Sequence, residues 1–148
     1  MKTIKLLSLG LFLSGAMLFS SCKKEGCTNP DADNYDASAN ISDKSCLYTT
    51  DVIFWLKEDQ SNSLVNDDIK KVDFYLNEEF LGNASTESFW DEAPTCDSTN
   101  VIRFSKELQK SNSEPFYYYV KDDEGFTLFQ GLTELDTDSC RVILLEGY

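Results

Sequence analysis

The sequence contains no histidine, and this absence excludes several kinds of catalytic and metal site. Ser-His-Asp triads, Cys-His dyads, histidine-ligated zinc sites and imidazole pH switches all need that side chain. The chain also lacks a glycine-rich phosphate loop, a nucleophile elbow and a Cys-x-x-Cys pair. Most of the common hydrolase machinery is therefore missing, and we expect a protein that is not an enzyme.

Basic residues are scarce relative to acidic ones. Thirteen Lys and Arg accompany 26 Asp and Glu among 148 residues, which gives a net charge of -13. Because a surface of that sign repels phosphate groups, nucleic acid is not an expected partner. Hydrophobic residues nevertheless make up 41% of the chain and aromatic residues 13%, which is enough for one folded domain.

The N-terminus has the pattern of a secretory signal peptide. Lys2 and Lys5 form a basic start, and residues 6–19 are mostly apolar. About 20 apolar residues are needed to cross a bilayer, whereas about 7–15 suit the apolar part of a signal. We therefore expect residues 1–21 to be a cleaved signal peptide. Its removal takes away two lysines and no acid, so the net charge falls from -13 to -15.

The end of this segment, Phe19-Ser20-Ser21-Cys22, resembles the lipobox of bacterial lipoproteins, although Phe19 stands where leucine is commonest. The resemblance implies cleavage before Cys22 and attachment of lipid to its sulfur, with residues 22–25 as a tether. Long acyl chains would hold such a protein at a membrane. Lysine after the cysteine resembles a signal for delivery to the outer membrane, so we expect a location in the cell envelope. The alternative is an ordinary signal peptide cut elsewhere, which leaves Cys22 a free thiol.

Residues 26–48 form a polar segment bounded by Cys27 and Cys46. Asp, Asn and Ser are abundant in it, large apolar residues are rare, and neither helical nor strand periodicity is present. Its stability must therefore come from something other than a core. A Cys27–Cys46 disulfide, which an oxidising compartment favours, removes about 3 kcal/mol of unfolded-state entropy.

The same segment resembles a short cysteine-bounded repeat of extracellular proteins from the Bacteroidota, related in character to the calcium-binding acidic repeats of thrombospondin type 3. The residues that carry the resemblance are Gly26-Cys27-Thr28, Asn29-Pro30, Asn34-Tyr35 and Ser45-Cys46. Where that family often ends in Asp-Asp-Gly-Ser-Cys, this chain has Ser42-Asp43-Lys44-Ser45-Cys46, with one carboxylate and the turn glycine missing. The resemblance implies lineage and an extracytoplasmic location rather than an activity.

Oxygen-bearing side chains in this segment form a candidate calcium site, namely Asp31, Asp33, Asp36, Asn40 and Asp43. Calcium prefers about 6–8 oxygen ligands, some of them from the backbone. The spacing is not that of an EF-hand, because neither the glycine at position 6 nor the glutamate at position 12 is present. The alternative is that these residues only initiate turns, which Asp and Asn side chains do well.

From residue 50 onward the pattern is that of β-strands, so residues 50–148 are expected to form one domain. Alternation in Val72-Asp73-Phe74-Tyr75-Leu76 indicates a sheet with one buried face. A helical turn or two is expected only near residues 105–110. About seven strands in such a length predict an all-β sandwich. The hairpin sequence from Val72 to Gly82 resembles the hairpins of immunoglobulin-like and transthyretin-like modules on bacterial surfaces, and this resemblance implies a sandwich of one of those two types. The expected segments are 52–56, a hairpin over 72–83, 101–104, a hairpin over 116–130, and 141–145.

Two further features lie in the loops of this domain. Cys96 and Cys140 are the pair that remains once the other cysteines are assigned, and a bond between them contributes about 4 kcal/mol by the chain-entropy model. Phe89 and Trp90 are adjacent aromatic residues outside any clear strand. They are candidates for stacking on a sugar or contacting a protein, and the alternative is that they cover an open end of the sandwich.

Three functions are compatible with these patterns. The first is a non-catalytic, lipid-anchored envelope protein that serves as a binding or structural accessory module. The second is a calcium-stiffened surface module that binds glycan or protein through Phe89 and Trp90. The third, a small carboxylate hydrolase, needs two acids facing each other across a cleft about 5–9.5 Å wide, whereas the acid pairs of this chain are neighbours at turns.

Overall fold

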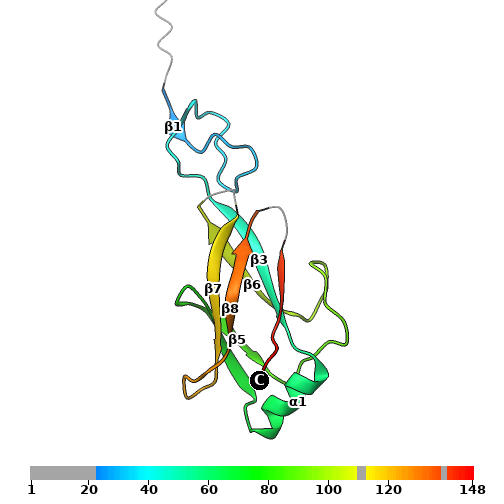
Figure 1. Cartoon of the computed structure of the whole chain (residues 1–148). Coiled ribbons are helices and arrows are strands. Elements are labelled where there is room, and N and C mark those ends of the chain that lie inside the picture. The colour runs from blue at the N-terminus through cyan, green and yellow to red at the C-terminus, as the bar shows by residue number, and fades with distance from the viewer. Residues whose placement is uncertain (1–22, 110–112, 138–139) are drawn as a thin grey trace, which may run out of the picture.

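A computed structural model describes residues 23–109, 113–137 and 140–148. The expected signal peptide and Cys22 lie outside the described residues. A small irregular unit follows the N-terminal segment and leads into a larger β-domain (Figure 1). No helix within the described residues is long and apolar enough to cross a membrane.

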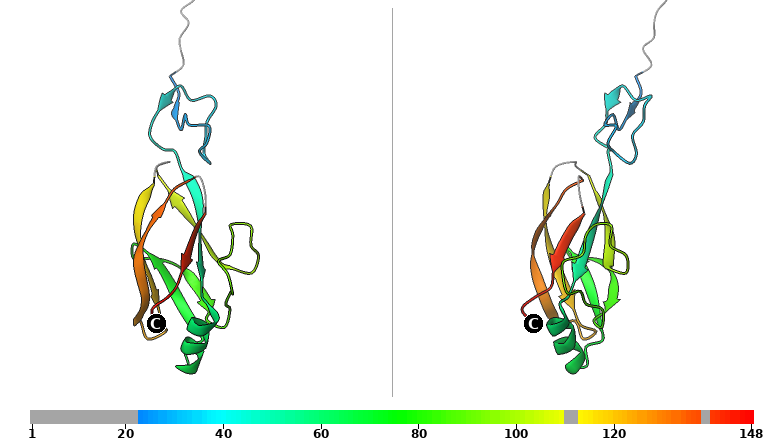
Figure 2. Two further views of the ribbon diagram at one scale, coloured as in Figure 1. Left: turned by 45° about the vertical axis from the view of Figure 1, so that its right-hand side comes forward. Right: turned by 90° about the vertical axis from the view of Figure 1, so that its right-hand side faces the viewer.

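The β-domain consists of two facing sheets (Figure 2). The three-stranded sheet has the order β6-β3-β9 and the four-stranded sheet the order β5-β4-β7-β8. All neighbours are antiparallel except β3 and β9, which run parallel. The strands are β3 (Tyr48–Trp55), β4 (Lys71–Leu76), β5 (Glu79–Ser85), β6 (Ile102–Leu108), β7 (Glu114–Lys121), β8 (Thr127–Leu135) and β9 (Arg141–Leu144).

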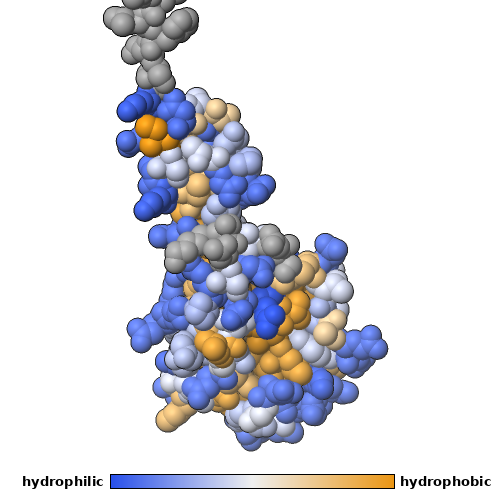
Figure 3. Space-filling model, turned by 45° about the horizontal axis from the view of Figure 1, so that its top comes forward, coloured by the Kyte–Doolittle hydropathy of each residue, from blue (hydrophilic) through white to orange (hydrophobic). Residues whose placement is uncertain are grey.

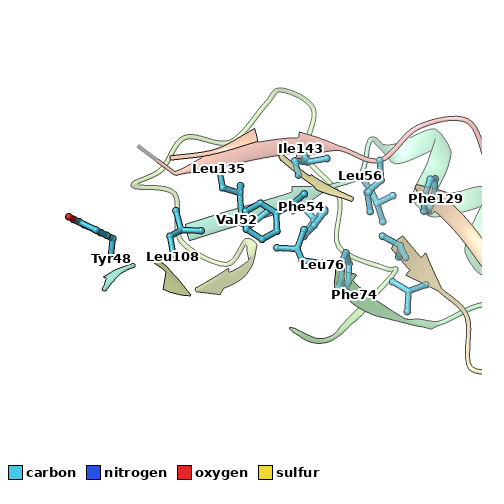
Figure 4. Packing of buried hydrophobic residues seen from close by; sticks show 14 of the residues in the cluster. Tyr48, Val52, Phe54, Leu56, Phe74, Leu76, Leu108, Phe129, Leu135 and Ile143 are labelled. Carbon is cyan, nitrogen blue, oxygen red and sulfur yellow. The ribbon is translucent and has the colours of Figure 1, made fainter. Parts of the chain in front are cut away.

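Alternate residues of each strand fill the space between the sheets, as the period of two requires. The Phe54 ring of β3 is 1% exposed and packs 4.8 Å from the Phe74 ring of the opposite sheet and 5.7 Å from the Tyr118 ring, measured between centroids. Figure 4 shows Val52 and Phe54 together with Leu76 and Phe74 in this core. The prediction of an all-β sandwich is thereby confirmed.

The sheet order differs from that of an immunoglobulin constant domain. In an immunoglobulin constant domain the first two strands are neighbours in one sheet. Here the first two strands of the domain, β3 and β4, lie in opposite sheets, and the first strand pairs instead with the last. The strand order is therefore not that of an immunoglobulin constant domain.

The position of the helix was predicted wrongly. Residues 105–108 belong to β6, where Phe104 and Leu108 point into the core. The inward and outward alternation that begins at Ile102 continues to Leu108, although Lys106 is polar. The one helix of the described chain is α1 (Glu58–Asn66), at the end of the sandwich opposite the irregular unit (Figure 1). Only Leu64 and Ser61 of α1 are buried, so its sequence carries almost no apolar periodicity.

The irregular unit is held by the predicted Cys27–Cys46 disulfide, which is present. Its only regular structure is a parallel pair of two-residue strands, β1 (Glu25–Gly26) and β2 (Ile41–Ser42). Lys24 is part of the folded unit as well, because its ammonium lies 2.7 Å from the Asp36 carboxylate and its backbone N–H donates to Asn40 Oδ1. Residues 24 and 25, expected in the tether, thus belong to this disulfide unit.

The disulfide unit and the sandwich join without a linker, since β3 begins at Tyr48, two residues after Cys46. The Tyr48 side chain is buried in one cluster with Cys27, Ala32 and the core of the sandwich. The Asn29 amide donates to its hydroxyl at 2.7 Å. This shared packing fixes the disulfide unit to one end of the domain.

Candidate functional site

The outer face of the four-stranded sheet carries a row of apolar side chains that nothing in the described chain covers. We call this set the aromatic face, and it consists of Tyr75, Phe80, Tyr117, Tyr119 and Leu132. The face arises from the pleat, because the residues that alternate with these ones point into the core. Phe80, Tyr117 and Leu132 are 52%, 57% and 59% exposed.

Strand register brings these residues into contact range across all four strands. Tyr75 of β4 lies opposite Tyr119 of β7 and also opposite Phe80 of β5, with 5.4 Å between the Tyr75 and Phe80 ring centroids. Tyr117 of β7 lies opposite Leu132 of β8. Residues opposite one another on one face are about 4.5–5.5 Å apart at Cβ, so the aromatic face is continuous.

Three shallow hollows surround Tyr119 on this face. The largest has a volume of about 410 Å³ and lies between Tyr119, Tyr75, Lys121 and Thr127. A second of about 340 Å³ extends over Tyr117, Gln130 and Leu132, and a third of about 240 Å³ lies beside Asn77 and Glu78. Tyr119 lines all three, so its ring stands at the centre of the site.

Polar groups are interspersed with the rings. The Lys121 ammonium lies 5.2 Å from the centroid of the Tyr75 ring, within the range of a cation–π contact. Asn77 is committed to the sheet, since its Oδ1 accepts from the Tyr117 backbone N–H at 2.9 Å. The side chains of Glu78, Gln130 and Thr127 make no hydrogen bond within the described part of the protein. The site therefore offers both flat apolar rings and free hydrogen-bonding groups.

The outer face of the three-stranded sheet is different, because the connection over residues 86–101 covers it (Figure 2). Ile53 and Trp55 point away from the core cluster and are nevertheless 0% and 7% exposed. The Trp90 backbone N–H donates to the Leu56 carbonyl at 2.9 Å. At the far end of the connection, the predicted Cys96–Cys140 disulfide is present and ties it to the start of β9.

An arginine on the same face completes this attachment. The Arg103 guanidinium lies 2.7 Å from the Asp51 carboxylate and also donates to the carbonyls of Cys96 and Ser98. The Ser105 hydroxyl donates to Asp51 as well. The hydrogen bond from Ser105 and, to a smaller extent, that from Arg103 hold the pKa of Asp51 below its ordinary value. The connection is therefore held to the sheet by the Cys96–Cys140 disulfide and by hydrogen bonds from Arg103, whose ion pair with Asp51 is supported by Ser105.

The predicted binding pair of Phe89 and Trp90 lies on this covering connection. Phe89 is 42% exposed, whereas Trp90 is partly buried and its backbone N–H is bonded to Leu56, the residue after β3. The two neighbouring rings therefore differ in exposure, and their role in binding stays a prediction. Trp90 belongs to the connection over the outer face of the three-stranded sheet, whereas the alternative interpretation put it over an open end of the sandwich.

The five candidate calcium ligands are not brought together as a ligand set. Hydrogen bonds from Lys24 and Ser38 lower the pKa of Asp36, whose carboxylate they occupy. Asp43 Oδ1 accepts from the Ser45 backbone N–H at 2.9 Å. Asp36 Oδ1 likewise accepts from the backbone N–H of Ser38, two residues further along the chain. In the described residues no three acidic or cysteine side chains gather to hold a metal ion. The hydrogen bonds are those of Asx turns, which the alternative interpretation predicted.

The aromatic face was not predicted as a site, although alternation in the sequence placed Tyr75 on the polar side of its strand. The signal that identifies the face is the occurrence of Tyr75, Tyr117 and Tyr119 at positions that alternate with core residues. Register alone shows that these positions are neighbours, and register is not readable from the separate strands.

No protein-family model, curated protein or solved structure matches this chain.

Proposed function

We propose that the protein is a lipid-anchored, non-catalytic module of the cell envelope, and that its sandwich binds a ligand through the aromatic face. The observation that carries this proposal is the contrast between the two outer faces. One is covered by a connection that a disulfide fastens, whereas the other leaves Phe80, Tyr117 and Leu132 more than half exposed. Exposed aromatic rings interspersed with polar groups are side chains of the kind that binding sites use.

The proposed anchor is supported by the sequence around Cys22 and by the two disulfides, which form in oxidising compartments. Lys24 already belongs to the disulfide unit, so Lys23 alone separates the proposed lipid from folded structure. The disulfide unit would then lie at the membrane surface with the sandwich beyond it. Hydrophilic residues cover most of that unit in Figure 3, while apolar residues gather over the sandwich.

Metabolic labelling with an alkyne fatty acid tests the anchor. We expect the full chain to incorporate the label in its native type of host and to fractionate with the outer membrane, and the Cys22→Ser variant to lose the label. Lys23→Ala serves as the matched control, because it changes a neighbouring residue without removing the sulfur. Equal labelling of the wild type and Cys22→Ser would refute lipid attachment at this position.

Site-specific photo-crosslinking in cells tests the binding face. A photoreactive amino acid at position 132 should form a covalent adduct with the ligand, since Leu132 is 59% exposed on the aromatic face. Position 35 is the control, because Tyr35 is a 45% exposed aromatic residue on the disulfide unit. An adduct at position 132 alone supports the proposal. The absence of any adduct there, or equal adducts at both positions, contradicts it.

A further inference from the structure

The size of the aromatic face limits what it binds. Three strand spacings of about 4.8 Å separate β5 from β8, and four residues at about 3.4 Å each separate Tyr117 from Lys121, so the face measures about 14 Å in each direction. The projected area between the strand axes is therefore about 200 Å², and even with side-chain relief this is small beside the accessible surface of about 800 Å² that each partner buries in a stable protein interface. A ligand with a small, flat footprint fits this face better than a second protein does.

The polar groups of the face define the chemistry of that ligand. Glu78, Gln130 and Thr127 have no hydrogen-bond partner within the described residues, and the hydroxyls of Tyr75 and Tyr119 have none either. A purely apolar ligand would take these donors and acceptors out of water without replacing their hydrogen bonds. The ligand must therefore carry apolar patches that stack on the rings and many hydroxyl-like groups around them.

The charge of the protein further limits which ligands can bind the aromatic face. The chain has a net charge of -13, and Lys121 and Glu78 bring one charge of each sign to the face itself. A ligand bearing phosphate, sulfate or carboxylate groups would approach against the field of the whole protein. A neutral ligand meets no such barrier.

A neutral glycan has these properties, because a pyranose ring presents a C–H face for stacking and hydroxyls at its rim. We propose, on the basis of the function proposed above, that the aromatic face binds a neutral polysaccharide chain. Tyr119 lies at the centre of the site, where it lines all three hollows, and Tyr75 and Tyr117 flank it. Adjacent hollows share residues, so successive sugar units of one chain occupy them in turn. Gln130, Glu78 and Thr127 hydrogen-bond the sugar hydroxyls.

Affinity electrophoresis with the detergent-solubilised full-length protein tests this inference. Native gels would contain one neutral polysaccharide each, namely laminarin, mannan, xylan or amylopectin, with polygalacturonate as the anionic comparison. We expect at least one neutral glycan to retard the wild type. Tyr119→Ala should weaken that retardation about tenfold, in line with the loss of one aromatic stacking contact. Tyr119→Phe, which keeps the ring and removes the hydroxyl, should weaken it less.

Phe89→Ala is the matched control, since it removes an exposed aromatic ring from the other side of the sandwich. It should leave retardation unchanged, and equal melting temperatures show that all variants are folded. The inference is overturned if none of the neutral glycans retards the wild type, if only polygalacturonate does, or if Tyr119→Ala binds like the wild type. A protein adduct at position 132 without glycan binding would overturn this inference and leave the proposed binding function standing.

Discussion

Removal of the Cys27–Cys46 disulfide should unfold the disulfide unit locally and leave the sandwich folded. The unit has little else to stabilise it, because β1 and β2 have two residues each and Cys27 and Ala32 are its only buried apolar residues besides the junction at Tyr48. Closing a loop with a sequence separation of 19 contributes about 3 kcal/mol by the chain-entropy model. We expect the double variant Cys27→Ser/Cys46→Ser to lose that amount from the local opening free energy.

Hydrogen exchange followed by mass spectrometry measures this effect directly. A loss of about 3 kcal/mol corresponds to exchange about 150-fold faster. The affected amides include Asp33, Asp36 and Asn40, which donate to carbonyls within or next to the unit. Exchange in the strands of the sandwich should stay slow.

The matched control is Cys96→Ser/Cys140→Ser, which should accelerate exchange in the 86–101 connection and β9 while amides in the disulfide unit keep their rate. Unchanged exchange over residues 24–46 in the first variant would refute the view that the disulfide supplies most of the stability of the unit. Equal acceleration throughout the sandwich would refute the view that the unit opens separately.

Three further outcomes are expected. Phe54→Ala should lower the free energy of unfolding by about 3–5 kcal/mol in denaturant titrations, because the ring is 1% exposed and packs against the opposite sheet; a loss below 1 kcal/mol would contradict the core assignment. The pKa of Asp51 is lowered by Ser105 and Arg103, so its stabilising contribution is complete above the usual pKa of 3.8 and is lost as the pH falls toward the lower folded value. Asp51→Asn should therefore lower the free energy of unfolding at pH 7 and make it decrease less between pH 5 and pH 2.5 than it does in the wild type. If the variant and the wild type lose equal free energy of unfolding over that pH range, the ion pair is contradicted. Millimolar Ca²⁺ should leave the melting temperature unchanged in calorimetry, since turn hydrogen bonds already occupy the carboxylates of Asp36 and Asp43. A rise of several degrees would instead support the calcium site.

Much of the sandwich was predictable because strand alternation is a local signal. The hairpin expected over residues 72–83 is β4 and β5, and the one expected over 116–130 is β7 and β8, each slightly longer than expected. Helix α1 was missed because Leu64 is its single buried apolar residue, and a polar segment with one apolar contact has no detectable helical period. Tertiary contacts stabilise that segment as a helix, namely the burial of Leu64 in the core cluster and the hydrogen bond from the Ser61 hydroxyl to the Thr86 carbonyl.

The candidate site was less predictable than the fold. Phe89 and Trp90 were predicted as a binding pair because adjacent aromatic residues in a loop lack an obvious core position. In the structure, Trp90 belongs to the connection that covers β3. Tyr75 and Tyr119 are ordinary strand residues when each is taken alone, and their pairing across β4 and β7 makes them neighbours in the candidate site. That pairing joins residues 44 positions apart in the chain.

Composition and short-range pattern were sufficient for the strand content, the two disulfide pairings and the exclusion of histidine chemistry. These properties depend on residue types and on spacings of a few residues, or on the small number of ways in which four cysteines can pair once the lipobox resemblance sets Cys22 aside. The sheet order, the cover over β3 and the open aromatic face depend on which strands are neighbours. Strand neighbours are chosen by the packing of the whole domain, because every strand here has an apolar side that fits several partners equally well until all of them share one core.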